Sequence, residues 1–486
     1  MSQRRISFKV SNEIVFDQLP DDLRERIAST LTISNPERQN AQNQKIPGWW
    51  RIPEHIKLYT QQAGLMTVPR GVFSDLMGLF SHMGLLDVSC KDSTISFPAA
   101  IPEFRVDLRT HQTLAVDKIT EGKTGIYEAP PGSGKTVTTL FAMARTQQRS
   151  IVIVNTTNIA SQWADRCETF LGFRPGVIGD GSWDESQPIT IALNQTLASR
   201  SDELQESGWF DQWGFVCLDE CHHVTASTFF AVMSRFSARW RIGVSATPDR
   251  DNGLAGVAYA VLGPVLHRTE KSELKGQGFL VEPSIKKVPT TFNHPYFSTH
   301  WADSTCELEG CIEVGRHRHQ NNYQAVVGAL AEDTHRNDLI AARISSNWGC
   351  ANLVLSKRLG HLERLRALVL EGGKFDESRL FMLTGRESTE ERMRVVAEAD
   401  AASCVIFSTI ADEALDVPRL DRLYLTWPTK SSAVIRQQVG RVERAHPRKT
   451  TAVVYDFVDG AVAPLARQWS KRSIDVYARE GFLIST

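Results

Sequence analysis

Long apolar runs, an excess of charge of one sign and a cysteine framework are all missing from this sequence of 486 residues. No apolar stretch is long enough to span a bilayer, and Met1–Arg5 opens polar and basic, so we expect a cytoplasmic protein without a membrane partner. The eight cysteines are scattered, and Cys217 and Cys404 lie inside apolar runs, which favours reduced, buried thiols. A net charge of −1 argues against a uniformly basic coat but allows a local basic channel.

Apolar runs without polar alternation organise the chain from about Asp107 onward, a pattern typical of strands buried on both faces of a parallel sheet. The expected strands of the first half are Gly125–Glu128, Ile151–Asn155, Ile189–Ala192, Phe215–Leu218 and Arg241–Ser245. Those of the second half are Asn352–Leu355, Arg379–Leu383, Cys404–Ser408, Arg422–Thr426 and Thr451–Phe457. Amphipathic segments alternate with the runs, so the pattern predicts two successive α/β sheets, joined near residues 275–278 or near Pro283.

The first hundred residues follow a different pattern. Ile6–Phe16 predicts a strand, Asp21–Ser29 a helix and Val72–Met83 an apolar helix, with a polar stretch at Asn35–Gly48. We therefore expect a small α/β domain at 1–103, a first large domain at 104–283 and a second at 284–486.

A glycine-rich segment, Ala129-Pro-Pro-Gly-Ser-Gly-Lys-Thr136, lies between an expected strand and an expected helix at Val137–Arg145, the context that a P-loop requires. Glycines let backbone N–H groups turn toward phosphates, and the helix N-terminus adds its dipole. Lys135 is expected to neutralise the β- and γ-phosphates, and the Thr136 hydroxyl to bind Mg²⁺. The expected ATP-binding residues of this loop are Pro131, Gly132, Ser133, Gly134, Lys135 and Thr136.

Two carboxylates end a later strand, in Val216-Cys-Leu-Asp-Glu-Cys-His222. Downstream of a P-loop, Asp219 is expected to hold Mg²⁺, and Glu220 to act as the general base toward the attacking water. The pair of motifs predicts an ATPase that uses Mg²⁺.

These residues resemble superfamily 2 helicases over most of residues 104–460, particularly the group of UvsW, XPB and RecG. Asp219-Glu-Cys-His222 resembles the DExH box, and Ser245, Ala246 and Thr247 resemble motif III, which couples hydrolysis to strand grip. Leu108–Gln112 is similar to an upstream glutamine motif in which Gln112 reads adenine. Asn155 replaces the proline usual in motif Ia, and Ala414 the glycine usual in motif V.

The resemblance implies an α/β fold of two tandem RecA-like P-loop domains, parallel sheets with helices on both faces, preceded by the small α/β domain. It implies that motifs Ia, Ic, IV and V touch the nucleic-acid backbone, contacts that position a strand without reading its sequence. The residues expected to make them are Thr156, Thr157, Gln195, Thr196, Ser356, Arg358, Thr384, Gly385, Ser408 and Thr409. In motif V, Asp416 is expected to bind the nucleotide.

Motif VI, Gln437-Gln-Val-Gly-Arg-Val-Glu-Arg444, is the expected source of arginine fingers. Charge builds on the γ-phosphate in the transition state, and guanidinium groups stabilise it by fork-like hydrogen bonds. On a helix, Arg441 would share a face with both Gln437 and Arg444. We therefore count Gln437, Arg441 and Arg444 as catalytic candidates, with Lys135, Asp219, Glu220 and His222.

The N-terminal domain resembles, more loosely, the leading domain of UvsW in the order of Asn35-Pro36, Gly48-Trp49, Arg51-Ile52 and Pro69-Arg70-Gly71. The resemblance implies a branched or distorted duplex, and exposed Trp and Arg side chains can stack on unpaired bases. In the alternative, Trp49, Trp50 and Tyr59 fill a small core.

Two further segments are ambiguous. Cys306, Cys311, His317 and His319 have ligand types that suit zinc, but their spacing matches no standard finger, so we favour a site without metal. Aromatic residues nearby (Phe292, Tyr296, Phe297, Trp301) and the basic tail Arg467–Arg479 fit either strand contacts or ordinary packing.

Three functions stay open at this stage. The main reading is an ATP-dependent helicase or translocase that acts on branched or duplex DNA. DExH boxes also serve RNA, and no residue here clearly reads a 2′-hydroxyl. The third is an ATP-gated nucleic-acid-binding subunit of a larger assembly that does not unwind.

Overall fold

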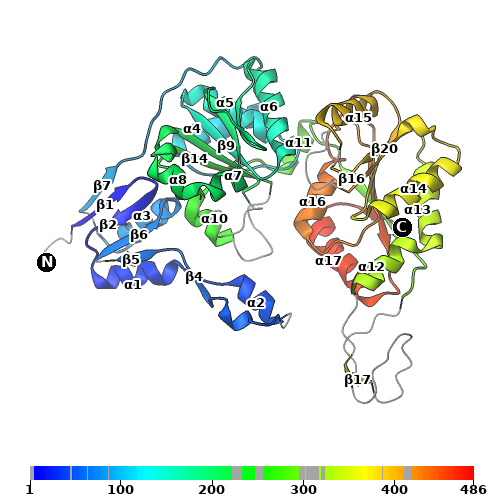
Figure 1. The fold of residues 1–486 in the computed structure, drawn as a ribbon, viewed down its shortest axis with the longest axis horizontal. Helices are drawn as coiled ribbons and strands as arrows, with labels where there is room; N and C mark the ends of the chain where they lie inside the picture. The colour runs from blue at the N-terminus through cyan, green and yellow to red at the C-terminus, as the bar shows by residue number, and fades with distance from the viewer. Residues whose placement is uncertain are drawn as a thin grey trace. The chain divides into compact units, whose positions relative to one another are not determined.

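The computed structural model describes residues 5–485 except 44–45, 63, 86, 222–231, 247–254, 295–300, 303–316, 319–322, 386 and 410–416. It divides into two compact units, Met1–Leu274 and Lys275–Thr486. Each contains one large sheet, coloured cyan to green in the first unit and green to red in the second (Figure 1). The predicted division into three domains at 103 and 283 stays a prediction.

The first unit opens with an N-terminal module (residues 5–92) built on a five-stranded sheet of order β5-β6-β2-β1-β7. Its strands are β1 (Ile6–Val10), β2 (Glu13–Phe16), β5 (Thr60–Gln62), β6 (Leu65–Pro69) and β7 (Val88–Asp92). Helices α1 (Asp21–Thr30) and α3 (Phe73–His82) confirm two predicted helices. The single strand predicted at Ile6–Phe16 is wrong: β1 and β2 form an antiparallel hairpin whose turn holds Ser11 and Asn12.

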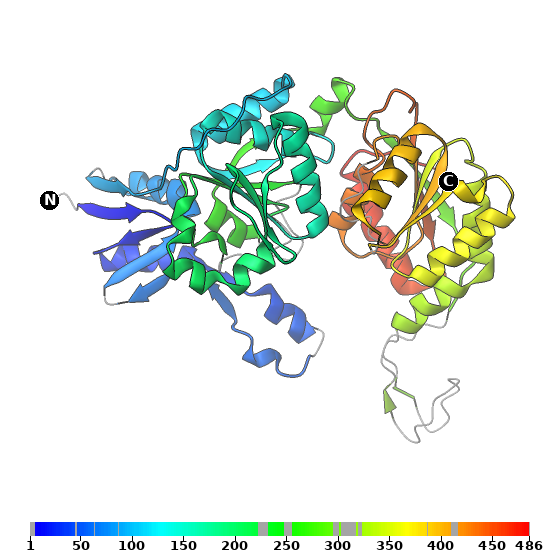
Figure 2. The same ribbon diagram turned by 45° about the horizontal axis from the view of Figure 1, so that its top comes forward.

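Between α1 and β5 lies a small substructure, which we call the arm (residues 32–57). Strands β3 (Thr32–Ser34) and β4 (His55–Lys57) pair antiparallel and enclose α2 (Pro36–Asn43) and the 3₁₀ turn η1 (Trp49–Arg51). In Figures 1 and 2, α2 and β4 extend away from the five-stranded sheet. A helix therefore occupies part of the stretch that the sequence marked only as polar.

The large sheet of the first unit has the order β11-β10-β12-β9-β13-β14-β8-β15 and is parallel except for the β10–β11 pair. Its strands are β8 (Thr124–Glu128), β9 (Ser150–Val154), β10 (Gly176–Gly179), β11 (Ser182–Trp183), β12 (Ile189–Leu193), β13 (Phe215–Asp219), β14 (Trp240–Ser245) and β15 (Val265–Arg268). All five strands predicted for this half are confirmed within about one residue at each end. The short strands β10, β11 and β15 were not predicted.

Side chains of alternate residues in these strands pack into two separate hydrophobic cores, one on each face of the sheet. One face packs against α4 (Thr110–Gly122), α5 (Lys135–Thr146) and α6 (Thr157–Leu171). The other packs against α7 (Asn194–Ser199), α8 (Ser201–Glu206) and α10 (Ala255–Leu262). Burial on both faces explains why the strands read as unbroken apolar runs.

Arg70 joins the N-terminal module to this sheet. The side chain is 2% exposed, and its Nη1 donates to the Ala238 carbonyl at 2.7 Å and to the Ser11 carbonyl at 3.2 Å. Its Nη2 donates to Thr124 Oγ1 at 3.1 Å, at the first residue of β8. Burial lowers the pKa of Arg70 well below its usual value. Arg70 is thus a structural residue, and the expectation that an exposed arginine stacks on bases does not apply to it.

Arg241 makes the complementary contact from the sheet. It is 1% exposed and donates to the Asn12 carbonyl at 2.9 Å and the Val261 carbonyl at 3.3 Å, while Asn12 Nδ2 donates to the Ser234 carbonyl at 2.8 Å. Burial lowers the pKa of Arg241 to about 10. The module and the first large sheet therefore share one continuous polar junction.

The second unit contains a parallel sheet of order β20-β21-β19-β22-β23-β16-β24. Its strands are β16 (Pro283–Pro289), β19 (Ala351–Leu355), β20 (Leu380–Leu383), β21 (Cys404–Ser408), β22 (Arg422–Leu425), β23 (Ala452–Val458) and β24 (Ile484–Ser485). The five predicted strands are confirmed, and β16 and β24 are additions. This unit and the first large sheet give the predicted RecA-like architecture.

Helices cover both faces of this sheet too. Helices α13 (Thr334–Ser345) and α14 (Leu359–Glu371) pack on one face, and α15 (Thr389–Ala401) and α16 (Ser432–Gly440) on the other. A smaller core joins α12 (Tyr323–Glu332) to the start of α17 (Ala463–Arg472). Within the described part of the chain, no helix has the length and apolarity needed to cross a membrane.

We expect Arg70→Ala to lower the free energy of unfolding of the first unit by about 3 kcal/mol, because one buried and two partly buried acceptors lose their donor. Denaturant unfolding of the full chain measures the loss. Arg26→Ala, an exposed position on α1, is the matched control and should change stability by less than about 0.5 kcal/mol. Equal stabilities of the two variants would contradict the junction described here.

Candidate active site

The glycine-rich segment forms a loop between the end of β8 and the start of α5. Gly132 and Gly134 have φ of +82° and +86°, a left-handed backbone that glycine adopts without strain. Helix α5 begins at Lys135, two residues before the predicted start, so the Lys135 and Thr136 N–H groups belong to the helix N-terminus. The Lys135 amino group donates to the Ala129 carbonyl at 3.1 Å and lies over the loop.

Two residues of α4 stabilise the loop through contacts with the Ser133 carbonyl. His111 Nε2 lies 3.0 Å from the Ser133 carbonyl, and Gln112 Nε2 donates to the same carbonyl at 3.3 Å. Gln112 Oε1 accepts the Arg109 N–H at 3.0 Å. The φ of +86° at Gly134 favours glycine, and a Cβ there would also come within 2.3 Å of Gln112 Nε2. These contacts give Gln112 a role in shaping the loop, and its reading of adenine stays a prediction.

Parallel pairing places three strand ends at one edge of the first sheet. β14 lies between β8 and β13, and all three run in the same direction. The Ala129 N–H donates to the Ser245 carbonyl at 3.0 Å, and the Cys221 N–H to the Val244 carbonyl at 3.2 Å. The phosphate loop, Ser245 and Asp219 therefore meet at the carboxyl edge, where ligands bind in open α/β sheets.

Asp219 ends β13 with both oxygens hydrogen-bonded. Oδ2 accepts the Trp163 indole N–H at 2.7 Å, and Oδ1 accepts the Glu220 N–H at 2.9 Å. Burial and the neighbouring Glu220 raise the pKa of Asp219 to about 6, opposed by the Trp163 hydrogen bond and the positive charge of Lys135. A cation at this edge would favour the ionised carboxylate.

The backbone at Glu220 is unusual. Its φ is +47°, in the left-handed region that non-glycine residues occupy only at an energetic cost. The chain therefore turns sharply directly after the strand that Asp219 ends. Residues in such conformations cluster at functional sites, where the surrounding structure maintains them.

The donors at this edge fit Mg²⁺. The Thr136 hydroxyl and the Asp219 carboxylate are oxygen ligands, which this hard cation prefers, and it binds few protein groups besides phosphates and water. When bound, Mg²⁺ would neutralise charge that develops on the phosphates. Lys135 supplies a second positive charge, and Glu220 a carboxylate for orienting a water.

Several predicted residues lie outside the described residues: His222, Thr247, Asp416, Cys306, Cys311 and His319. For His317 only the backbone is described, in the short strand β18 (His317–Arg318) that pairs with β17 (Trp301–Ala302). Ser245 is buried at the end of β14 and Ala246 follows it. No cluster of metal ligands occurs among the residues that are described, which leaves the zinc question untested.

The candidate nucleic-acid contacts of the first unit lie at helix starts. Thr156 caps α6 by accepting the Ile159 N–H at 3.4 Å, and Thr157 is exposed in the first turn. Gln195 and Thr196 occupy the start of α7, and Gln195 is exposed. Both helices follow strands of the same parallel sheet, so these residues share its carboxyl edge.

Motif VI differs from the prediction. Helix α16 ends at Gly440, with Arg441 as its C-cap, so the prediction that Arg441 and Arg444 share a helix face is wrong. The chain leaves the helix because the segment around Arg444 pairs with another: Leu280 bridges Arg444, and the Val281 N–H donates to the Glu443 carbonyl at 2.6 Å. The tertiary contact decides the conformation here.

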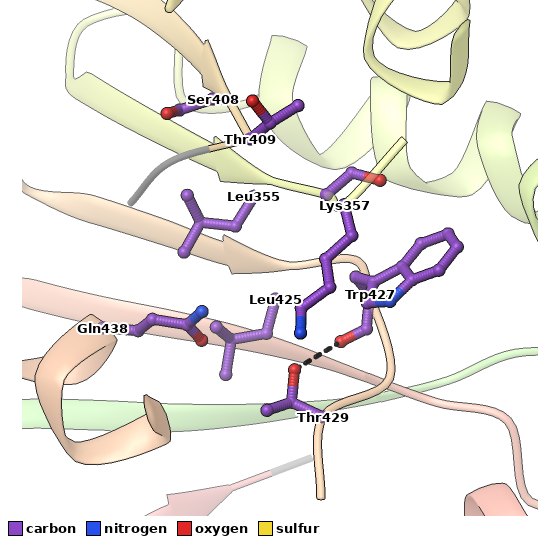
Figure 3. Close-up of a pocket in the computed structure, with 9 residues that line it drawn as sticks. Leu355, Lys357, Ser408, Thr409, Leu425, Trp427, Thr429 and Gln438 are labelled. Carbon is purple, nitrogen blue, oxygen red and sulfur yellow. Dashed lines mark hydrogen bonds between the residues drawn. The ribbon is translucent and has the colours of Figure 1, made fainter. Parts of the chain in front are cut away.

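A pocket opens at the carboxyl edge of the second sheet (Figure 3), where three of the predicted contact residues meet. It is lined by Leu355, Ser356, Lys357, Ser408, Thr409, Leu425, Trp427, Thr429 and Gln438. The Lys357 amino group points into the pocket toward Thr429. Arg358 lies beside it, with its guanidinium 5.7 Å from the centre of the Trp427 ring. A cation, hydroxyls and an indole in one hollow suit a phosphate and its sugar or base.

Ser356 is tied to a buried relay. Asn337 Nδ2 donates to the Ala331 carbonyl, so Asn337 Oδ1 accepts from His361 Nε2 at 3.0 Å. Nδ1 of that ring then accepts the Ser356 hydroxyl, also at 3.0 Å. Burial and neighbouring arginines lower the pKa of His361 to about 3, so the ring is neutral. Because its proton is engaged, Ser356 acts as an anchor of the loop that carries Lys357 and Arg358.

Thr384 and Gly385 are also engaged. The Thr384 hydroxyl and N–H donate to Glu387 Oε1 at 2.7 and 2.8 Å, and the Gly385 N–H donates to Oε2 at 2.9 Å. Burial opposes ionisation of Glu387, but these hydrogen bonds outweigh it and lower its pKa. A phosphate would have to replace this carboxylate to reach the same donors.

The part of the chain that contains the phosphate loop and Asp219 is similar to known proteins. Residues 105–250 match the family described as "Type III restriction enzyme, res subunit" (ResIII). The chain is 22% identical to the DNA 3'-5' translocase XPB2 of Sulfurisphaera tokodaii, over 74% of this chain and 83% of that protein. It is 24% identical to the ATP-dependent DNA helicase uvsW of phage T4, over 76% of this chain and 72% of that one. Residues 105–250 thus match a restriction-enzyme family model, and the chain is distantly similar to DNA helicases of superfamily 2.

Two further proteins are similar to this chain, one in sequence and one in structure. A protein of Acanthamoeba polyphaga mimivirus named as an ATP-dependent RNA helicase is 25% identical over 84% of this chain and 74% of its own length. A fragment named as an HsdR subunit of a type I restriction enzyme from Vibrio vulnificus has a TM-score of 0.54 at 17% identity, covering 75% of this chain and 66% of the fragment. The latter supports the two-sheet fold.

Sequence reasoning missed the residues that support the motifs. Neither residue type nor position in a motif indicated a role for five of them: Trp163, His111, Lys357, Trp427 and His361. Lys357 could have been predicted, because it lies between Ser356 and Arg358, two predicted nucleic-acid contacts of motif IV. Trp163 is six positions after Thr157 on a helix, and its partner is distant in sequence, so no spacing rule could have connected them.

We predict that Glu220→Gln retains ATP binding but lowers turnover about 100-fold or more, because the amide cannot accept a proton from water. Lys135→Ala should instead weaken ATP binding, since the positive charge over the loop is lost. Fluorescent-nucleotide binding and single-turnover hydrolysis separate the two effects. Lys118→Ala, an exposed lysine of α4, is the control and should match the unmodified chain.

Proposed function

We propose that the protein is an ATP-dependent DNA helicase or translocase that acts on branched or duplex DNA. The observation that carries the proposal is the carboxyl edge of the first sheet, where a phosphate loop faces Asp219 and Glu220. The relatives named as DNA translocase and DNA helicase span about three quarters of this chain and most of their own length. ATP with Mg²⁺ is the energy source, and DNA the partner.

Hydrolysis follows from the groups at this edge. Lys135 and the N–H groups at the start of α5 would bind the phosphates, and Thr136 and Asp219 would hold Mg²⁺, which would neutralise phosphate charge. Glu220 orients the attacking water and accepts its proton. For Gln437, Arg441 and Arg444 of motif VI, a role in hydrolysis stays a prediction, based on the ability of guanidinium groups to stabilise charge on a γ-phosphate in the transition state.

Contact with the DNA backbone falls to residues at the carboxyl edges of both sheets. Thr157 and Gln195 are exposed in the first unit, and Lys357 and Arg358 add positive charge in the second. Such contacts grip a strand independently of its sequence. Grip that changes with the bound nucleotide would make the enzyme a motor.

The preference for branched DNA rests on the arm. Trp50 is 61% exposed and Ile46 47%, whereas most aromatic residues of the module pack in its core. The Arg38 guanidinium lies 5.4 Å from the centre of the neighbouring Trp49 ring, which supports the tryptophan pair from one side. An exposed indole beside basic residues can stack on an unpaired base at a junction.

RNA as the substrate is the alternative that the mimivirus relative favours. A nucleic-acid-binding ATPase that does not unwind is the other. Both use the same ATP site, and they differ in which polymer stimulates hydrolysis and in whether strands separate.

We expect Arg441→Ala and Arg444→Ala to lower the turnover of ATP at least about 100-fold while ATP affinity stays within about threefold, because the guanidinium groups act in the transition state. Steady-state ATPase rates and nucleotide titrations measure both quantities. Arg394→Ala, on the exposed face of α15, serves as control. Unchanged turnover in Arg444→Ala would contradict the proposal that Arg444 stabilises the transition state of ATP hydrolysis.

ATPase stimulation across single-stranded DNA, forked DNA, a four-way junction and RNA tests the substrate. Forked and four-way DNA should stimulate hydrolysis most. Stimulation by RNA alone would establish the RNA alternative, and equal rates with and without any nucleic acid would refute a motor. A flat strand-displacement assay together with a flat triplex-displacement assay, at full ATPase, would favour the subunit without unwinding.

Trp50→Ala tests the arm in the same assay. It should weaken the apparent affinity for forked DNA about tenfold, since stacking contributes about 1–3 kcal/mol per base, and leave stimulation by blunt duplex DNA unchanged. Trp348→Ala is the matched control, because Trp348 is 60% exposed and lies outside the arm.

A further inference from the structure

Trp163 connects a core helix to the magnesium-binding carboxylate. It lies in α6, which follows β9, and β9 pairs with β13 in the same sheet. The side chain is 2% exposed and packs in the core between the sheet and α4 to α6. Its indole N–H reaches past the end of β13 and donates to Asp219 Oδ2 at 2.7 Å.

The chemistry of the donor matters at this position. An indole N–H only donates, so it cannot compete with Asp219 as a ligand, and it adds no positive charge that would repel a cation. Each oxygen of Asp219 accepts one N–H, from Trp163 and from Glu220, which fixes the rotation of the carboxylate about χ2. A carboxylate oxygen has more than one acceptor direction, so both oxygens keep a lone pair for a bound cation or its water.

Packing alone does not explain this hydrogen bond. Trp213 is 0% exposed on the opposite face of the same sheet, and its indole N–H has no hydrogen-bond partner among the described residues. A buried indole is therefore accommodated in this unit without an acceptor, so burial of Trp163 does not by itself require the hydrogen bond to Asp219.

We propose that Trp163 is a positioning residue for Mg²⁺: its indole N–H holds the Asp219 carboxylate in the orientation that binds the cation of Mg·ATP. The inference deepens the proposed function and rests on it. Partners that orient a metal ligand contribute about 10- to 100-fold to metal affinity in other sites, which sets the size of the expected effect.

The test is Trp163→Phe in the full chain, which keeps an aromatic ring and removes the donor. Mn²⁺ binding in the presence of saturating ADP, followed by electron paramagnetic resonance, should weaken about tenfold. The Mg²⁺ concentration for half-maximal ATPase should rise by a similar factor, with turnover at saturating Mg²⁺ recovering to within about threefold. ADP affinity without metal should stay unchanged.

Trp213→Phe is the matched control, since it removes the same atoms from a buried site without an acceptor. It should leave Mn²⁺ affinity unchanged even where it lowers thermal stability. If Trp163→Phe does not fold, replacement of Trp163 by β-(3-benzothienyl)alanine removes the N–H at nearly constant shape and decides the question.

Equal Mn²⁺ affinities of the Trp163 and Trp213 variants, in a chain that hydrolyses ATP, would overturn the inference alone. An unmodified chain that neither binds Mn²⁺ with ADP nor hydrolyses ATP would instead overturn the proposed function.

Discussion

The parallel pairing of β8, β14 and β13 is the constraint on which the candidate site depends. Side chains 129–136 and 219–220 are distant in sequence, and they meet only because each follows a strand that runs the same way in the same sheet. The hydrogen bond from the Ala129 N–H to the Ser245 carbonyl continues this pairing into the loop. A register shift of one residue would turn Asp219 to the other face and separate it from the phosphates.

The opposite ends of the same strands carry the N-terminal module. Arg70 contacts Thr124, the first residue of β8, and the phosphate loop follows the last residue of that strand. The charge is buried, and its hydrogen bonds fix the module in one orientation. Among its described residues, the arm is held by contacts within itself, such as the hydrogen bonds from Asn35 Nδ2 to the Pro53 carbonyl and from Arg38 Nη1 to the Ile52 carbonyl. The module and the first large sheet therefore belong to one compact unit, and the arm presents the exposed Trp50.

The sequence predicted the central strands of both sheets well because they are buried on both faces, which leaves a continuous apolar run such as Ile151–Val154. β16, which lies next to the short edge strand β24, carries no such signal, because it begins and ends with proline and contains Lys286 and Lys287. The hairpin at Ser11-Asn12 was missed because two short strands and a polar turn resemble one long strand. The site motifs were recognisable since phosphate and Mg²⁺ chemistry restricts residue types at fixed spacing. The end of α16 was not, because pairing of residues 279–281 with 443–445 overrides local helix preference.

What a motif leaves undetermined is how its side chains are held. Asp219 is identified by its place at the end of a strand, but its carboxylate is held by Trp163 from another element. The left-handed backbone at Glu220 cannot be predicted from its residue type. The same holds in the second unit, where Ser356 fits a phosphate-contact motif but its hydroxyl donates a hydrogen bond to His361. In each case the supporting group is buried and neutral, so it adds no charge to the site. An ATPase edge needs its charges free for phosphate and cation, and neutral donors are the groups that can orient a carboxylate or a loop without neutralising it.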